Sequence, residues 1–119
     1  MDVTIYHNPR CSKSRQTLTL LTERGIEPTI VDYIENPPSA DDLLEILLMM
    51  DAGPRDIIRK GEAVYKQFEL KDPALTDDAL IAAMVGHPIL IERPIVVVGD
   101  KAVIGRPPSA VLDILEDQA

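Results

Sequence analysis

The stretch from His7 to Arg15, with the sequence HNPRCSKSR, contains the only cysteine of the chain. It lies where an apolar, strand-like run gives way to a helical pattern. Backbone N–H groups at the start of a helix and the positive end of its dipole favour a thiolate over a thiol. Arg10 and Lys13 flank Cys11, and His7 lies four residues upstream. Because such surroundings lower the pKa of a cysteine, the stretch predicts a nucleophilic or redox thiol.

The same residues also have simpler interpretations. A lone cysteine is commonly a buried side chain that only packs. His7 is also consistent with a loop histidine that caps or packs, and an arginine taken singly is usually a solvated surface residue. His87, before a proline at a predicted helix end, is interpreted as structural.

The composition is that of an ordinary globular protein with an aliphatic core. Of the 119 residues, 45% are hydrophobic, 27% are charged and 3% are aromatic. This length predicts a single domain, residues 1–119, that folds without disulfides or metals. No apolar run is long enough to span a membrane, and the first residues lack the pattern of a signal peptide. We therefore expect a cytoplasmic protein with no membrane partner.

The cysteine count and the net charge limit the chemistry further. One cysteine cannot form an internal disulfide, so a redox reaction needs a thiol from another molecule. The net charge of −8 argues against nonspecific binding to nucleic acid. No metal site and no bound cofactor are predicted, and we expect a monomer.

Hydrophobic patterns and turn residues predict an α/β fold. Strands are predicted at Val3–Tyr6, Thr29–Tyr33, Ile95–Val98 and Ala102–Ile104. The first two strands enclose a helix and must run parallel, whereas Gly99-Asp100 predicts an antiparallel hairpin between the last two.

Helices occupy most of the remaining chain. They are predicted at Ser12–Arg24, from the N-cap Ser39 to before Gly53, at Pro54–Arg59 and at Glu62–Gln67. A further helix, Leu80–Val85, starts with Thr76, Asp77 and Asp78, and the last runs from Ala110 to about Asp117. The helix that begins at Ser39 is predicted to bury one face, which comprises Leu43, Leu44, Ile46, Leu47 and Met50. This order predicts a thioredoxin-like fold. It would have a four-stranded mixed sheet and a helical insertion, about residues 39–87, between its βαβ and ββα halves.

Three arginines lie at the ends of predicted elements. Arg59 precedes a Lys-Gly pair, Arg93 precedes a proline, and Arg106 precedes two prolines. A guanidinium presents a planar fork of donors that suits a tetrahedral oxyanion, and binding groups often lie on loops beside a rigid scaffold. In the predicted topology, the loops on either side of the hairpin approach the Cys11 loop. Together, the three arginines predict an oxyanion site.

Several motifs of the chain resemble one family. They are His7-Asn8-Pro9-x-Cys11 with Ser14-Arg15, Glu35-Asn36-Pro37-Pro38, Arg59-Lys60, His87-Pro88-Ile89-Leu90-Ile91-x-Arg93-Pro94-Ile95-Val96-Val97 and Gly105-Arg106-Pro107. Together they resemble the ArsC-type arsenate reductases linked to glutathione and glutaredoxin, over nearly the whole chain.

The resemblance implies an oxidoreductase and a role for each matching residue. Cys11 would be the nucleophile that attacks arsenate or a similar small oxyanion, and His7 would favour its thiolate. Arg59, Arg93 and Arg106 would bind the oxyanion and the thiol-linked intermediate.

Supporting roles are implied for Asn8, Ser14 and Pro94. Pro94 would follow a cis peptide bond and face the cysteine. No cofactor would be bound, because glutathione and glutaredoxin would act as external reductants and as partners.

The chain also departs from the arsenate reductases proper, which usually carry glycine and threonine where it has Ser12 and Lys13. It is more similar to a short branch of the family. The related Spx proteins bind RNA polymerase and carry a C-x-x-C motif, but here the second position is Ser14. The alternative function is therefore a non-catalytic, Spx-like regulatory or binding module that docks to a partner through its acidic helical block.

Overall fold

The computed structural model describes residues 2–116 and divides the chain into two compact units. The first unit contains the residues up to Asn36 and those from Arg93 onward, and the second runs from Pro37 to Glu92. The helical insertion predicted at about 39–87 corresponds to the second unit. The single domain over residues 1–119 stays a prediction.

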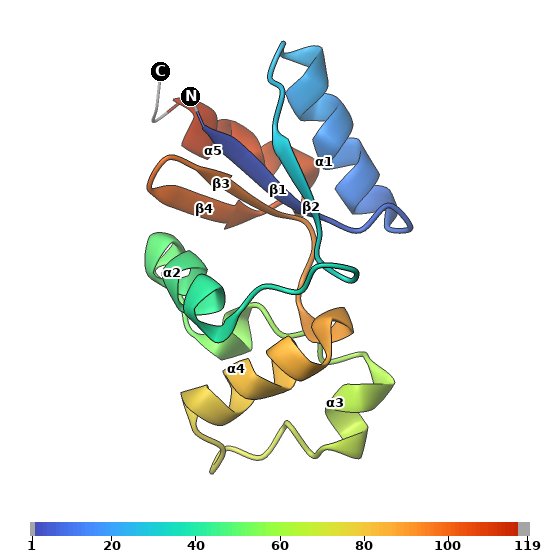
Figure 1. Ribbon diagram of the computed structural model, residues 1–119, viewed down its shortest axis with the longest axis vertical. Coiled ribbons are helices and arrows are strands. Elements are labelled where there is room, and N and C mark those ends of the chain that lie inside the picture. Colours follow the sequence, from blue (N-terminus) through green and yellow to red (C-terminus); the bar gives the residue numbers. More distant parts are fainter. Residues whose placement is uncertain (1, 117–119) are drawn as a thin grey trace. The chain divides into compact units, whose positions relative to one another are not determined.

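The first unit is built on a four-stranded sheet with the order β2-β1-β3-β4. The strands are β1 (Val3–His7), β2 (Thr29–Asp32), β3 (Ile95–Val98) and β4 (Lys101–Ile104). Strand β1 pairs parallel with β2 and antiparallel with β3, and β3 pairs antiparallel with β4 (Figure 1). The predicted mixed sheet and the βαβ and ββα order are confirmed.

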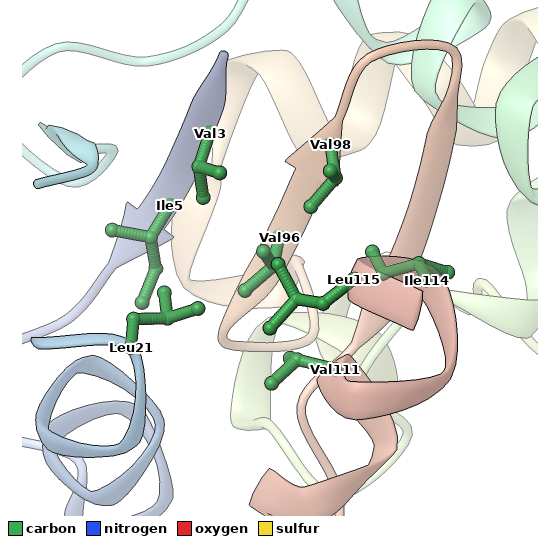
Figure 2. Packing of buried hydrophobic residues seen from close by; sticks show 8 residues of the cluster. All are labelled: Val3, Ile5, Leu21, Val96, Val98, Val111, Ile114 and Leu115. Carbon is green, nitrogen blue, oxygen red and sulfur yellow. The ribbon is translucent and has the colours of Figure 1, made fainter. Parts of the chain in front are cut away.

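One face of this sheet carries the core of the unit. Side chains alternate along β1, so that Val3, Ile5 and His7 are buried on the same face. Helices α1 (Ser12–Glu23) and α5 (Val111–Glu116) cover this face, with a 3-10 turn at Pro108–Ala110 before α5. The cluster consists of Val3, Ile5, Leu21, Val96, Val98, Val111, Ile114 and Leu115 (Figure 2). The same alternation that builds this core therefore also buries His7.

The second unit is helical throughout its regular elements. It contains α2 (Ala40–Met50), α3 (Ala63–Gln67) and α4 (Asp77–Gly86), with 3-10 turns at Pro54–Asp56 and Pro88–Leu90. The predicted N-cap Ser39 is confirmed, since its hydroxyl accepts the Asp42 N–H at 3.1 Å while the Asp42 carboxylate accepts the Ser39 N–H. No helix among residues 2–116 is long and apolar enough to cross a membrane.

Two details of the second unit differ from the prediction. The helix predicted at Pro54–Arg59 ends at Asp56, because the β-branched Ile58 is extended and forms an isolated bridge with Ile91. Leu44 was predicted to be buried but is 43% exposed. Its neighbour Leu43 is buried as predicted, and because successive helix residues are about 100° apart, Leu44 points away from the buried face.

Two further predictions concern Met50 in α2 and the end of the final helix. Met50, predicted on the same buried face of α2, is only half-buried. The predicted end of the final helix at Asp117 lies outside the described residues.

A pair of isoleucines tests the placement of the core. Ile5 and Ile30 are paired across β1 and β2, but Ile5 is fully buried and Ile30 is 52% exposed on the edge strand. Ile5→Ala should lower the free energy of unfolding by about 2–5 kcal/mol, since it leaves a cavity. Ile30→Ala should cost about 1 kcal/mol or less. Urea denaturation of both variants measures the difference, and equal losses would contradict the described register.

Candidate active site

Cys11 lies at the N-terminus of α1, as the N-cap residue, with an extended backbone. Its N–H donates to the Asn8 carbonyl at 3.0 Å, and its own carbonyl accepts the Arg15 N–H at 3.0 Å. The turn from β1 into α1 thus ends at the cysteine, as the sequence predicted. This position puts the sulfur beside the first backbone N–H groups of the helix.

A buried serine holds this turn together. The Ser14 side chain is fully buried, and its Oγ lies 2.6 Å from His7 Nδ1 and accepts the Asn8 N–H at 3.0 Å. Asn8 Oδ1 in turn accepts the Arg10 N–H at 3.0 Å. The predicted supporting residues Asn8 and Ser14 are therefore brought together with His7 and fix the path of the chain that leads to Cys11.

His7 is buried at the end of β1, and this burial lowers the pKa of its imidazole below the ordinary value of 6.5. Asp32, its neighbour on β2, raises the pKa in part, and Arg15 lowers it again. The histidine is thus mainly neutral at pH 7. The structure brings His7 to Ser14, and its influence on the thiolate stays a prediction.

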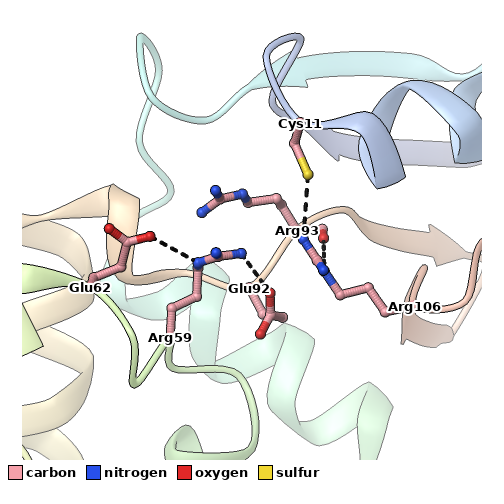
Figure 3. A network of polar contacts seen from close by, with 6 residues as sticks. All are labelled: Cys11, Arg59, Glu62, Glu92, Arg93 and Arg106. Carbon is pink, nitrogen blue, oxygen red and sulfur yellow. Dashed lines mark hydrogen bonds and ion pairs between the residues drawn. The ribbon is translucent and has the colours of Figure 1, made fainter.

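The thiol of Cys11 lies in a field that favours its ionised form. Partial burial alone would raise its pKa, but the backbone N–H of Ser14, the Arg93 guanidinium, the backbone N–H of Lys13 and the charge of Arg106 all lower it. The net effect is a thiol pKa below the ordinary value. Arg106 Nη2 donates to Cys11 Sγ at 3.4 Å (Figure 3). The predicted activated thiol thus has identifiable donors around it.

Arg93 and Arg106 are linked to one another as well as to the thiol. Arg106 Nε donates to the Arg93 carbonyl at 2.7 Å (Figure 3). The peptide bond between Arg93 and Pro94 is cis, as predicted, and the bond between Arg106 and Pro107 is also cis, which was not predicted. The structure therefore brings two of the three predicted arginines together at Cys11.

Gly105 allows this close approach of the two loops. Its N–H donates to the Pro94 carbonyl at 2.9 Å. A Cβ atom at this position would lie 2.7 Å from Thr17 Oγ1 and 2.8 Å from Pro94 Cγ, closer than such atoms can approach. Thr17 is fully buried in α1, and its hydroxyl donates to the Lys13 carbonyl at 2.8 Å. Only glycine fits here without displacing the segment that carries Arg106.

Sequence reasoning missed both Gly105 and Thr17 as residues that position the site. Gly105 directly precedes Arg106 in the Gly105-Arg106-Pro107 motif, and this position could have indicated that the glycine helps to place the arginine. The threonine gave a weaker one, because its spacing of three residues from Ser14 places both on the same side of α1.

Arg59 belongs to the second unit and has carboxylate partners there. Its Nε lies 3.1 Å from Glu62 Oε1, and its Nη1 lies 3.0 Å from Glu92 Oε1 (Figure 3). Its backbone N–H donates to the Leu90 carbonyl at 2.7 Å. The participation of Arg59 in the Cys11 site stays a prediction.

Between Asp2 and Glu116, no group of three or more His, Cys, Asp or Glu side chains is arranged to hold a metal ion.

The sheet order, the helix after β1 and the thiol at the start of that helix define a thioredoxin-like α/β protein. A family model described as ArsC family matches residues 6–114. The chain belongs to the ArsC family. The fold class that the sequence predicted is thereby confirmed.

Individual relatives agree with this assignment. The chain is 55% identical to the uncharacterized protein YfgD of Escherichia coli (strain K12), over 95% of this chain and 96% of that one. It is 47% identical to an arsenate reductase of Escherichia coli, over 98% of this chain and 82% of that one. The solved structure of an arsenate reductase from Vibrio cholerae is 50% identical and superposes with a TM-score of 0.94, covering 96% of this chain and 98% of that one.

The pKa of the thiol can be measured through its reactivity. The rate of alkylation of Cys11 by iodoacetamide should reach half its maximum at a pH below that of N-acetylcysteine under the same conditions. In Arg106→Gln the midpoint should rise, because loss of the guanidinium charge and of the hydrogen bond to the sulfur disfavours the thiolate. An unchanged midpoint in this variant would show that Arg106 does not act on the thiol.

The glycine between the loops gives a second test. Gly105→Ala should lower the free energy of unfolding by about 1–3 kcal/mol, since the new methyl group is overpacked. It should also raise the pH midpoint of Cys11 alkylation, because Arg106 is displaced. Gly61→Ala is the control: no atom lies within 4 Å of the added Cβ, so the stability should change by roughly 0.5 kcal/mol or less.

Proposed function

We propose that this protein reduces arsenate to arsenite and that Cys11 is the nucleophile. The observation that carries the proposal is the hydrogen bond between the Arg106 guanidinium and the Cys11 sulfur, at 3.4 Å, beside the Arg93 guanidinium that also lowers the thiol pKa. A nucleophile and two cations suited to an oxyanion thus share one site. Relatives that are 44–47% identical over 98% of this chain are named arsenate reductases, which supports arsenate as the substrate.

The proposed reaction begins with attack of the Cys11 thiolate on arsenic. A sulfur–arsenic bond forms, one arsenic–oxygen bond breaks, and the departing oxygen takes up two protons and leaves as water. The thiolate of glutathione then attacks the Cys11 sulfur. The electron pair of the sulfur–arsenic bond passes to arsenic, which is reduced from arsenate to arsenite, and the two sulfurs form a disulfide. Arsenic gains two electrons and the two thiols lose one each.

The arginines would neutralise the oxyanion during the first step. Arg93 and Arg106 approach the sulfur from the segments before β3 and after β4, so an oxyanion that meets the thiolate would meet their N–H donors as well. Arg59 is proposed as a third donor. It would have to exchange its contacts with Glu62 and Glu92 for contacts with the substrate.

The second thiol must come from another molecule, because Cys11 is the only cysteine. We assign this role to glutathione, and glutaredoxin would then reduce the Cys11–glutathione disulfide and restore the enzyme. The environment that stabilises the Cys11 thiolate also makes it a good leaving group in that last exchange.

The alternative, a non-catalytic binding module related to Spx proteins, is less well supported. A protein that only docks to a partner has no need of cations arranged around a thiol. The relation to Spx proteins stays a prediction.

A coupled assay distinguishes the two functions. With glutathione, glutaredoxin and glutathione reductase present, the wild type should consume NADPH in an arsenate-dependent manner. Cys11→Ser should be inactive yet folded by circular dichroism, because a hydroxyl is nearly the same size as a thiol but far less nucleophilic. Absence of arsenate-dependent turnover in the wild type would reject the reductase and favour the binding module.

Substitution of arginine by lysine tests the oxyanion site. Arg59→Lys, Arg93→Lys and Arg106→Lys keep the charge but lose the planar fork, so each should lower kcat/KM for arsenate by about tenfold or more. Arg24→Lys is the matched control. Arg24 is an exposed residue at the end of α1, where only a positive charge is needed, so its kcat/KM should stay within about twofold of the wild type. Four equal values would contradict the proposed oxyanion site.

A further inference from the structure

A groove runs along α1 from the residue next to the nucleophile. Its α1 side is one helical stripe that begins at Ser12 and ends at Glu23, and the 3-10 turn before α5 forms the other side. The groove measures about 620 Å³, within the range of sites for small ligands. Leu20 and Pro108 are the apolar lining residues, and most of the others are polar.

Arg15 provides the positive charge of this groove. It lies one helical turn beyond Cys11, whose carbonyl accepts the Arg15 N–H. Its Nη1 donates to the Pro9 carbonyl at 2.9 Å, which uses one of the five donors of a guanidinium. Arg15 is exposed, so the remaining donors can reach a ligand that enters the groove. The reaction described above assigns no function to this residue.

The charges around the groove select for an anion at the end near the thiol. The chain carries a net charge of −8, yet Arg10, Lys13 and Arg15 follow one another within six residues around Cys11. At the far end of the groove lies Glu23, about 12 Å from Arg15 along the helix axis at 1.5 Å per residue. A carboxylate would therefore be attracted to the Arg15 end and repelled from the Glu23 end.

We propose that this groove binds the carboxylate-bearing peptide thiol that attacks Cys11, and that Arg15 pairs with its carboxylate. The inference rests on the proposed function, which requires a second thiol from outside the chain. A tripeptide extends about 10 Å, so it fits within the α1 side of the groove, which spans about 16 Å from Ser12 to Glu23 at 1.5 Å per residue. Bound in this way, the thiol would be held next to the Cys11 sulfur, and the disulfide would form between two positioned groups.

The first test compares two thiols at saturating arsenate. Arg15→Gln should raise the KM for glutathione about fivefold, the effect expected for loss of a partly exposed ion pair. Its rate with 2-mercaptoethanol should stay unchanged, because this thiol has no carboxylate. Its KM for arsenate, measured in a separate titration, should also stay unchanged. Arg24→Gln removes the same charge outside the groove and should leave all three values unchanged. An unaltered KM for glutathione, or an equal loss with both thiols, would overturn the proposal.

A second measurement does not depend on arsenate reduction. The single cysteine of the wild type can be converted into a 2-thiopyridyl mixed disulfide, and the release of thiopyridone by each thiol can be followed in a stopped-flow instrument. Arg15→Gln should slow the release by glutathione about fivefold relative to the release by 2-mercaptoethanol. This result would support the groove even if the wild type failed to reduce arsenate, and equal ratios in wild type and variant would reject it.

A substitution within the groove provides an independent check. Thr19 is exposed on the α1 side of the groove, away from the thiol. Thr19→Trp should narrow the groove while leaving Arg15 and Cys11 in place, and it should reduce the rate with glutathione but not with 2-mercaptoethanol. Unchanged selectivity in this variant would show that the thiol does not lie along α1.

Discussion

The pairing of β1 with β3 is the interaction on which the site depends. Tyr6 is opposite Ile95, so the chain leaving β1 and the chain entering β3 meet at one end of the sheet. Ile104 is opposite Ile95 on the other side, which brings the end of β4 to the same place. Cys11, Arg93 and the residues after β4 are thus gathered by the register of three strands. A shift of one residue in this register would separate them and turn the core side chains outward.

The thiol site combines a rigid base with a set of donors. Val3, Ile5 and His7 share one face of β1, so the alternation that buries the core also places the histidine against Ser14. Because this serine is fully buried, the turn before Cys11 has little freedom. The sulfur is therefore held close to the helix N–H groups and the guanidinium groups. Because these donors stabilise the thiolate only at short distance, the fixed position keeps the pKa of Cys11 low.

Much of the fold and part of the site could be predicted from the sequence. Strong periodicity and clear helix ends, such as the N-cap Ser39, predicted the elements and their order. The lowered pKa of the cysteine could be predicted because Cys11 lies between a strand and a helix. The fit of Gly105 against Thr17 was not predictable, because it depends on a close contact across 88 residues. The prediction for Leu44 was wrong because a local pattern does not fix the exact edge of the buried helix face. The prediction that Ile58 is helical was wrong because a local pattern does not fix where a short helix ends.

The activating contact of the thiol also has a consequence for the synthesis of the protein. Arg106 and Cys11 are 95 residues apart, and at 5–20 residues per second a ribosome needs on the order of ten seconds to make the intervening chain. Until β3 and β4 emerge, the nascent chain contains the cysteine but lacks the strands that bring the arginines to it. Until then the sulfur lacks both guanidinium groups, and only the nearby backbone N–H groups of Lys13 and Ser14 can lower its pKa. A chain that terminates before Arg93 carries this cysteine without either of its two arginines.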